Sequence, residues 1–447
     1  METPICDFVQ RYAVDAALRL HMPGHKGLPL LGPEPLDLTE ISGADVLYQP
    51  EGIIRQSEEN AAALFGSART VYSAEGSSLS IRAMLFLALQ YAHSIGRSPR
   101  IAAARNAHKV FLTASALLDL EIDWLYPEDS VSLLRCVISP ARLESYFAQC
   151  EALPAAVYIT SPDYLGNVAD IAGLAAVCHA RGVLLLVDNA HGAYLHFLPA
   201  PVHPLDLGAD LCCDSAHKTL PVLTGGGYLH IAHGAPALLS EQADDAMALF
   251  ASTSPSYLIL QSLDLANRCL AEGYRERLAA AAERWAKVRA ALIARGWCVT
   301  GDEPMKLTLL PKAFGYTGTE LAEYLAAQHM ECEFSDPDHL VLMLSPDWED
   351  ADAQAVERLL SALPRRPAIM ERPPRLAQPE RVLSPRAALF SPSAAVTPAQ
   401  AVGKVMASAS ISCPPAIPIV ACGERITSAA AKAMEYYGIR QIRVVNP

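Results

Sequence analysis

The stretch that decides the fold is VLLLVDNAHG, residues 183–192, in which five consecutive apolar residues are followed by Asp188. A short, uninterrupted apolar run bounded by polar residues is typical of a strand that is covered on both faces of a parallel sheet. Six other short runs have a similar character, and helical patterns separate several of them: TVYSA, RIAAA, EIDWLY, AAVYIT, ADLCCD and GGYLHI. The sequence therefore predicts an α/β fold with a mainly parallel sheet.

The apolar pattern divides the chain of 447 residues into five predicted segments. Residues 1–55 are rich in Gly and Pro and predict an amino-terminal arm that wraps a neighbour. Residues 56–297 hold the seven strands and predict the large domain, and residues 298–363 predict a smaller domain of helices and strands. The prolines in residues 364–385 predict a linker, because proline cannot continue a helix or a central strand. Residues 386–447 form a last segment with short helical patterns at PAQAVGKVMA and TSAAAKAMEYYG.

Composition excludes several classes of function. The formal net charge of −13 disfavours nucleic acid, because phosphate binding needs a basic surface. No apolar stretch approaches the roughly 20 residues of a membrane helix, and the start METPICDFVQ does not resemble a signal peptide. The 11 cysteines include no CxxC pair that would suggest a metal or redox site. We expect a cytoplasmic protein without a metal; its acidity suits a cationic small molecule, although many soluble proteins are also acidic.

Polar residues that follow the strands are the candidates for chemistry, since ligands of open α/β sheets bind beyond the carboxyl ends of the strands. After TVYSA, the turn Gly76-Ser77-Ser78 leads into a helix, whose backbone N–H groups and hydroxyls suit a phosphate. An ordinary helix cap explains the same turn. After RIAAA comes His108, which could stack on a flat cofactor ring or transfer protons; a surface cap is the alternative.

Two further strand ends carry an acid and an amine. Asp188 ends a buried run, where a carboxylate is costly unless a cation neutralises it, and a protonated pyridine nitrogen is such a cation. After ADLCCD come Ser215, His217 and Lys218, which is one of only eight lysines. Lys218 can form an imine with an aldehyde cofactor while Ser215 and His217 hold its phosphate, although a solvated loop lysine is the alternative. The combination on one rim predicts pyridoxal phosphate (PLP).

These residues also resemble a known family, the bacterial-type ornithine/lysine/arginine decarboxylases within the fold-type I (aspartate aminotransferase-like) PLP enzymes. The resemblance covers most of the chain, and its most specific motifs are PGHKG within HMPGHKG (residues 21–27) and SxHKTLP within DSAHKTLPVLTGGGYLH (residues 214–230). Other matching stretches are ARNAHK, TSPDYLG, VDNAHGAYLHF, STSPSYLILQSLD and PPAIPIVACGERIT. The resemblance implies decarboxylation of lysine, ornithine or arginine to a polyamine-type amine.

The resemblance also implies a role for each residue of the motifs. Lys218 would hold PLP as a Schiff base, Asp188 would bind the ring nitrogen, and His108 would stack on the ring. His191 would lie beside the cofactor. Ser254 would lie close to the PLP phosphate of a partner subunit, in a homodimer or larger homo-oligomer with shared active sites. The residues implied to bind the phosphate within one chain are Gly76, Ser77, Ser78, Ser215 and His217.

The chain departs from the family at a few positions. Asn189 stands where the family commonly has Glu, and Asp163 stands where it has Thr. The chain begins almost directly at the PGHKG arm, so the resemblance implies the short form without the large amino-terminal wing domain. The distal charge of a basic substrate needs a carboxylate. Asp163, which follows a strand, is the first choice; the other candidates are Glu40, Asp45 and Glu424.

Two alternatives to decarboxylation stay open on the sequence. Another fold-type I activity, such as an aminotransferase or a carbon–sulfur lyase, would use the same cofactor. The chain has no clear motif for the arginine with which aminotransferases usually bind the α-carboxylate. A non-catalytic regulatory protein with a PLP-enzyme fold is the second alternative, which the presence of both Lys218 and Asp188 disfavours.

Overall fold

The computed structural model of the chain describes residues 1–15, 17–127, 134–409, 412–413 and 417–446. The chain forms two compact units, each assembled from separate stretches. The first unit comprises Met1–Ile101, Gln149–Ser161 and Ile171–Arg275. The second unit comprises Ala102–Ala148, Pro162–Asp170 and Glu276–Pro447. The five segments expected from the sequence stay a prediction.

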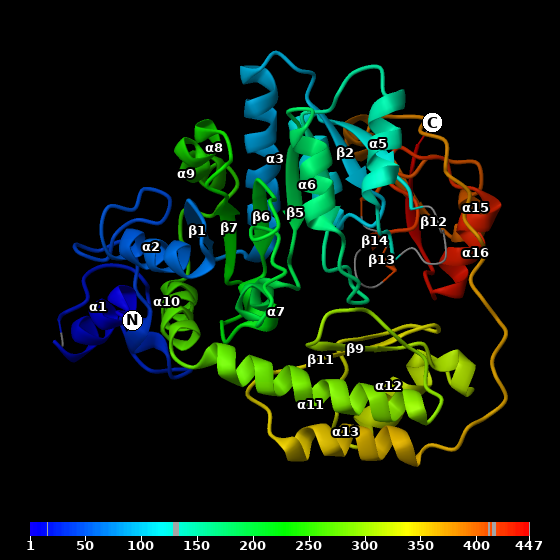
Figure 1. Cartoon of the computed structure of the whole chain (residues 1–447). Helices are drawn as coiled ribbons and strands as arrows, with labels where there is room; N and C mark the ends of the chain where they lie inside the picture. Colours follow the sequence, from blue (N-terminus) through cyan, green and yellow to red (C-terminus); the bar gives the residue numbers. More distant parts are fainter. Residues whose placement is uncertain (16, 128–133, 410–411, 414–416, 447) are drawn as a thin grey trace. The chain divides into compact units, whose positions relative to one another are not determined.

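The first unit is built on an open sheet whose strands lie in the order β1-β7-β6-β5-β4 (Figure 1). Strands β4, β5 and β6 are parallel, whereas β7 runs antiparallel to both β6 and β1. Every residue of β5, β6 and β7 is buried, as expected for strands covered on both faces. The strands are β1 (Arg69–Ser73), β4 (Ala156–Thr160), β5 (Leu184–Asp188), β6 (Leu211–Asp214) and β7 (Gly227–Ile231).

Helix α3 packs against β6 and β7 and brings its first turn to the strand ends (Figure 1). Helix α2 ends at Gly66, whose φ of 64° is the left-handed conformation that glycine adopts at helix ends. The helices of the first unit are α1 (Pro4–Val14), α2 (Ile53–Phe65), α3 (Gly76–Ser94), α6 (Ile171–His179), α7 (Ala216–Thr219), α8 (Ala237–Glu241), α9 (Ala243–Ala248) and α10 (Tyr257–Ala271), with the 3-10 turns η1 (Glu34–Leu36) and η2 (Ala193–Phe197).

The amino-terminal arm is only partly as the sequence predicts. Residues 4–14 form helix α1, which packs on α2 and α10 through Ile5, Cys6 and Val9, all of which are buried. This part of the arm therefore belongs to the core of its own chain. The rest of the arm, up to Gly52, has a single 3-10 turn and no longer helix or strand among its described residues.

The second unit combines helices with four sets of short strands. Strand β2 (Arg100–Ala104) is a neighbour of β3 (Glu121–Leu125), and a separate antiparallel sheet has the order β10-β11-β9-β8. Two antiparallel pairs, β12 with β15 and β13 with β14, follow near the carboxyl terminus. The remaining strands are β8 (Val299–Thr300), β9 (Lys306–Leu309), β10 (Phe334–Ser335), β11 (Leu340–Met343), β12 (Ser393–Val396), β13 (Ser412–Cys413), β14 (Ile417–Pro418) and β15 (Ile442–Val445).

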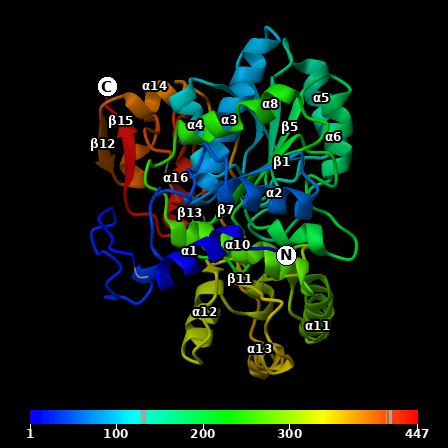
Figure 2. The ribbon, with the colours of Figure 1, turned by 90° about the vertical axis from the view of Figure 1, so that its left-hand side faces the viewer.

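The carboxyl-terminal segment shares a core with the small antiparallel sheet, because Met406, Met434 and Val444 pack in one cluster with Phe334 and Val341. Figure 2 shows α16 near the pair β12 and β15. The helices of this unit are α4 (Lys109–Leu118), α5 (Pro140–Gln149), α11 (Tyr274–Ala294), α12 (Gly318–Ala326), α13 (Asp350–Ala362), α14 (Pro385–Phe390), α15 (Pro398–Ala401) and α16 (Ser428–Tyr436), with the 3-10 turn η3 (Pro311–Phe314).

The predicted fold class, α/β with a mainly parallel sheet, is confirmed, and all seven predicted strands are present. The helical pattern expected over PAQAVGKVMA is much shorter than predicted, since α15 ends at Ala401 and Gly403 follows with a φ of 83°. Within the described residues, no helix is both long and apolar enough to cross a membrane.

Candidate active site

The ends of two neighbouring parallel strands bring the predicted acid and amine into one region of the first unit. Strand β5 ends on Asp188, and its register pairs Asp188 with Cys213 of β6. Lys218 lies in the short helix α7, which begins two residues after β6 ends. The Lys218 Nζ atom lies 3.1 Å from Nε2 of His191, which belongs to the loop after β5. The structure therefore brings Lys218 to the loop that Asp188 begins.

The start of helix α3 forms a turn lined by hydroxyl groups in the same unit. The Ser215 hydroxyl donates to Oγ of Ser77 at 2.7 Å, and both side chains are buried. A Cβ atom at Gly227 would lie 2.8 Å from the Asp214 carbonyl oxygen and 3.0 Å from the Gly76 carbonyl carbon. Only glycine fits there, so the backbone of β7 closes directly onto the turn. A helix start with hydroxyl donors is a site suited to a phosphate.

The other predicted phosphate-binding residues of the first unit lie around this turn. His217 Nδ1 lies 2.8 Å from the Gly226 carbonyl oxygen, and a Cβ atom at Gly76 would lie 3.4 Å from the His217 ring. Ser78 is the third residue of α3. Ser254 is exposed, and its segment reaches the turn because the Ser252 amide donates to Glu75 Oε1 at 2.7 Å.

Asp188 is a buried carboxylate whose hydrogen-bond donors are all neutral. The Tyr158 hydroxyl donates to Oδ2 at 3.0 Å, the Ala190 amide donates to Oδ1 at 3.2 Å, and the Cys213 thiol lies 3.7 Å from Oδ1. Within the described part of the chain, no lysine, arginine or histidine forms an ion pair with it. A buried carboxylate without a cation is costly. This acid suits a cationic group that the chain itself does not provide.

Sequence reasoning missed two features of this region. Tyr158, which orients Asp188, sits two residues before the end of β4; a tyrosine in an otherwise aliphatic buried strand was the available signal. Asp214 was also missed, although it ends β6 just as Asp188 ends β5. Asn189, His203 and His230 surround Asp214, and no motif in the sequence indicates that cluster.

Three predicted site residues belong to the second unit. His108 caps helix α4, since its Nδ1 accepts a hydrogen bond from the Val110 amide at 3.3 Å. Asp163 is buried, and its Oδ1 accepts from the Leu165 and Asn167 amides at 2.9 Å each. The Asn167 side chain also donates to both Asp163 oxygens. The position of His108 over the cofactor ring stays a prediction, and the Asp163 carboxylate is already used to shape its own turn.

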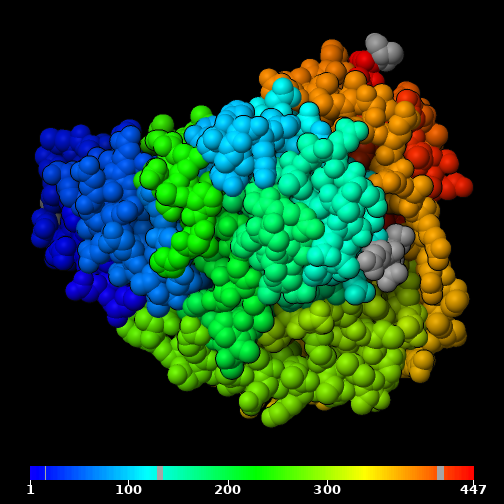
Figure 3. All heavy atoms as spheres, turned by 45° about the horizontal axis from the view of Figure 1, so that its top comes forward, coloured from blue at the N-terminus to red at the C-terminus, as the bar shows by residue number. Residues whose placement is uncertain are grey.

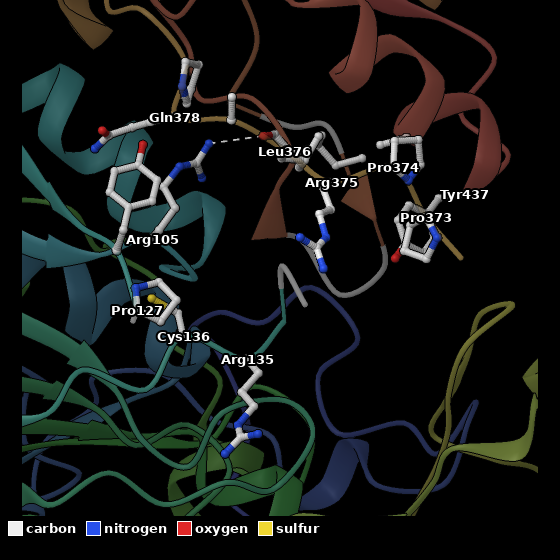
Figure 4. Close-up of a pocket in the computed structure, with 15 residues that line it drawn as sticks. Arg105, Pro127, Arg135, Cys136, Pro373, Pro374, Arg375, Leu376, Gln378 and Tyr437 are labelled. Carbon is white, nitrogen blue, oxygen red and sulfur yellow. Dashed lines mark hydrogen bonds between the residues drawn. The ribbon is translucent and has the colours of Figure 1, made fainter. Parts of the chain in front are cut away.

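Glu424 is the ion-pair partner of Arg105, which lines a pocket of the second unit (Figure 4). It is buried and forms an ion pair with Arg105, whose Nη2 lies 3.1 Å from Oε2. The Ala421 amide donates to the same oxygen at 2.6 Å. The pocket is lined by Arg105, Arg135 and Arg375, together with prolines of the predicted linker. The contacts of Glu424 account for its charge without a substrate, which weakens its predicted role.

In the first unit, Asp45 likewise accepts hydrogen bonds from five backbone N–H groups, most of them around the start of α2.

The geometry of the first unit fits PLP. A buried acid without a cation suits the pyridinium nitrogen, a turn with two buried hydroxyls suits the phosphate, and an exposed amine follows the neighbouring strand. These three requirements are met by Asp188, by Ser77 with Ser215, and by Lys218.

Comparison with known proteins supports a PLP-dependent enzyme. Residues 3–308 match the family described as "Orn/Lys/Arg decarboxylase, major domain". The uncharacterized protein YaaO of Bacillus subtilis is 29% identical, with 97% of this chain and 94% of YaaO covered. The arginine decarboxylase of the same organism is 28% identical over 81% of this chain and 77% of that enzyme.

A solved structure shares the fold. The lysine decarboxylase LdcF of Francisella novicida superposes with a TM-score of 0.80 at 17% sequence identity, covering 99% of this chain and 81% of that one. The likeness extends over nearly the whole chain and confirms the expected fold-type I architecture.

Proposed function

Because the chain belongs to the Orn/Lys/Arg decarboxylase family and is a PLP-dependent amino-acid decarboxylase, we propose that it releases the α-carboxyl group of a basic amino acid as CO2. The observation that carries the proposal is the buried acid Asp188, bonded only by neutral donors, on the strand next to the one that leads to Lys218. The amine product would be of the polyamine type, and we expect the reaction to take place in the cytoplasm.

Each residue of the proposed site in the first unit would have a separate role in binding PLP or in proton transfer. PLP, when bound, supplies an electron-withdrawing pyridinium ring. The Asp188 carboxylate would keep the ring nitrogen protonated, and the Tyr158 hydroxyl holds that carboxylate in place. The Lys218 amine would bind the cofactor and release the product, while His191, 3.1 Å away, can exchange a proton with its Nζ. Ser77, Ser215 and the first turn of α3 would bind the phosphate.

The substrate class rests on the relatives. Four relatives that each match about four fifths of this chain are named arginine decarboxylase, and the solved structures of similar fold include lysine decarboxylases. Asp163 and Glu424, which were expected to bind the distal charge, are held by neighbouring groups of the second unit. The proposal is therefore made for lysine, ornithine and arginine as a class.

The experiment measures CO2 release from purified, PLP-loaded protein with arginine, lysine and ornithine. Norleucine is the matched control, because it has an aliphatic side chain like that of lysine but lacks the distal ammonium. We expect CO2 from at least one basic amino acid and little from norleucine. Formation of a keto acid without CO2 would show an aminotransferase instead, and release of sulfide or thiol from sulfur amino acids would show a lyase of the other class.

A second observation favours a homodimer. The part of the arm that follows α1 carries large apolar side chains in water: Leu18, Leu20, Leu30 and Leu31 are each at least 80% exposed. The arm forms part of the molecular surface (Figure 3, dark blue). Several large apolar side chains exposed along one segment favour a surface that binds a partner. We propose that the arm of each chain covers a second copy and that Ser254 completes the partner's phosphate site.

The homodimer is tested by mixing inactive variants. Chains with Lys218→Ala are mixed with chains that carry Ser254→Ala and Leu30→Asp, under conditions where subunits exchange. If the sites are shared, mixed dimers regain part of the turnover, because one of their two sites then receives only intact residues. A fully active monomer in sedimentation, or no recovery after exchange is demonstrated, would contradict the proposal.

A further inference from the structure

A buried cluster of four polar side chains lies at the end of strand β6. Asp214 Oδ1 accepts a hydrogen bond from Asn189 Nδ2 at 2.6 Å. Asp214 Oδ2 lies 3.1 Å from His203 Nε2 and 3.3 Å from His230 Nε2. All four side chains are fully buried in the first unit. Burial of an ion is costly, so the Asp214 carboxylate needs hydrogen-bond donors or a cation to stabilise its charge.

The hydrogen bonds define the protonation of the cluster. The Leu205 amide donates to His203 Nδ1 at 3.4 Å, so the proton of that ring is on Nε2 and points to Asp214. Burial lowers the pKa of His230, which is therefore neutral at pH 7. Burial alone would raise the pKa of Asp214, but its contacts with His203 and His230 outweigh this and lower the pKa. Asp214 is thus a carboxylate hydrogen-bonded to Asn189 and His203, whereas His230 Nε2 lies 3.3 Å away without forming a hydrogen bond.

The bond between Asn189 and Asp214 ties together the two strand ends that carry the site. Asn189 follows Asp188 directly, and its backbone amide also donates to the Cys213 carbonyl at 3.0 Å. Asp214 precedes Ser215 and lies four residues before Lys218. The side chain of Asn189 also packs closely against Gly192, where a Cβ atom would lie 2.0 Å from Asn189 Oδ1. Side-chain and backbone bonds therefore fix β5 against β6 at the active-site edge.

We propose that Asn189 and Asp214 are positioning residues, which set the location of Asp188 relative to Lys218 through the buried pair between β5 and β6. The inference rests on the proposed function, since it assigns Asp188 and Lys218 to PLP. A carboxylate at position 189 would lie against the Asp214 carboxylate. An amide is the compatible partner here.

The same atoms allow a different interpretation. His203, Asp214 and His230 offer one ligand atom each within 4.8 Å of one another, which is close enough for a metal ion. A metal bound to His203 Nε2 would need a lone pair on that nitrogen. Because the Leu205 amide donates to Nδ1, the ring proton is on Nε2 and that lone pair is not available. The geometry therefore favours a hydrogen-bonded cluster, and metal content becomes an outcome of the test.

The experiment exchanges the two members of the pair. Asn189→Asp places two carboxylates together, whereas the double variant Asn189→Asp with Asp214→Asn restores one amide and one carboxylate in reversed order. The readouts are the dissociation constant of PLP, the absorbance of the bound cofactor, kcat and KM, and the thermal midpoint of the apo-protein. We expect Asn189→Asp to weaken PLP binding and lower kcat by roughly tenfold or more, as for a buried group left unpaired. The double variant should recover to within about threefold.

A matched control separates positioning from general stability. Asn267 is equally buried in the same unit, where its Nδ2 donates to the Tyr72 hydroxyl at 2.8 Å. Asn267→Asp should lower the thermal midpoint without changing PLP affinity in the folded fraction. If Asn189→Asp does not fold, Asn189→Ala removes the donor without adding a charge and gives the same comparison against the control.

Three results would overturn the inference. Asn189→Asp could behave like Asn267→Asp, with lower stability but unchanged PLP affinity and kcat. The double variant could show no recovery. One equivalent of bound metal, lost in Asp214→Asn, would identify a metal site instead. Wild-type protein that binds PLP but releases no CO2 from any basic amino acid would contradict the proposed function alone, because the comparison of PLP affinities would still decide the role of the pair.

Discussion

The buried carboxylates of the two units differ in what neutralises them. In the first unit, Asp188 receives hydrogen bonds from a hydroxyl, an amide and a thiol, none of which carries a charge. In the second unit, Glu424 is paired with the Arg105 guanidinium at 3.1 Å. Both acids are buried to a similar degree. One carboxylate thus lacks a cation, and the other already has one.

This difference separates a carboxylate that can bind a cationic ligand from a carboxylate that forms a structural ion pair. A paired buried charge is strongly destabilising to break but needs nothing further. A buried carboxylate with neutral donors gains most from a cation that arrives from outside, and the pyridinium ring of PLP is such a cation. Burial and residue type do not separate Asp188 from Glu424, because both acids share them; the partners of each acid and the position of Asp188 before the loop that contacts Lys218 do.

The comparison is sharpened most at Lys218, which we propose to link covalently to PLP, whose protonated ring nitrogen would be the cation beside Asp188. Lys218→Ala is expected to abolish turnover and the link that borohydride reduction makes permanent, since Lys218 Nζ lies 3.1 Å from His191 Nε2 in the loop that follows Asp188. Reduction followed by peptide mass spectrometry checks the attachment point. Lys109→Ala, in the second unit, is the control and should keep the label. A label on any lysine other than Lys218 would show that the PLP-binding lysine is assigned wrongly.

The next largest effect is expected at Asp188 itself. Asp188→Asn keeps the shape and can keep the bond from the Tyr158 hydroxyl, but it cannot hold the ring nitrogen protonated. We expect PLP to stay bound and kcat to fall roughly a hundredfold or more, as for loss of an activating group. Absorbance of the bound cofactor and steady-state kinetics measure the two effects separately. Turnover close to that of the wild type would remove the distinction drawn between Asp188 and Glu424.

Much of the first unit could be predicted because strands and strand ends are local features. The apolar runs located all seven strands, and the rule that ligands bind beyond strand ends selected Asp188 and Lys218. Asp163 shows where this reasoning stops. It also follows a strand, yet its Oδ1 accepts the amides of Leu165 and Asn167, so the position alone did not show that the carboxylate shapes its own turn.

The Asp214 cluster could not be predicted for a different reason. His230 reaches Asp214 only through the antiparallel register of β6 and β7, which pairs Cys212 with His230, and His203 comes from an irregular loop. Such partners depend on tertiary structure and leave no periodic pattern in the sequence. The same holds for α15, where a helical pattern was overridden by the turn at Gly403.

A smaller effect on activity, but a clear one on stability, is expected at Glu424. Glu424→Gln leaves the Arg105 guanidinium buried without its anion, which should cost about 3–5 kcal/mol of unfolding free energy. Urea unfolding measures this loss. The KM for a basic amino acid should change little in the folded fraction. A large rise in KM with unchanged stability would instead show that Glu424 binds the distal charge of the substrate.

A third kind of buried carboxylate completes the comparison, because Glu58 is neutralised by a proton. Its Oε1 accepts from the Tyr72 amide at 2.9 Å, while Oε2 has no hydrogen-bond partner among the described residues. Burial raises the pKa of Glu58 from 4.5 to about 8, against the lowering effect of the Tyr72 bond. The folded protein therefore carries Glu58 protonated at pH 7, whereas the unfolded chain carries it ionised.

The smallest expected effect on activity accompanies the pH dependence of stability that follows from this proton. Because the folded pKa lies above the unfolded one, the contribution of Glu58 to stability is full below about pH 4.5 and is lost as the pH rises to about 8. At about 1.4 kcal/mol per pKa unit, the loss is at most about 5 kcal/mol. Glu58→Gln cannot ionise and should flatten the fall in unfolding free energy between pH 5 and pH 8, measured by urea unfolding at each pH. Glu59→Gln, at a neighbouring exposed carboxylate that pairs with Arg55, is the control and should leave the slope unchanged. Parallel curves for wild type and Glu58→Gln would mean that Glu58 is ionised in the folded protein and has a cation partner of its own, like Glu424.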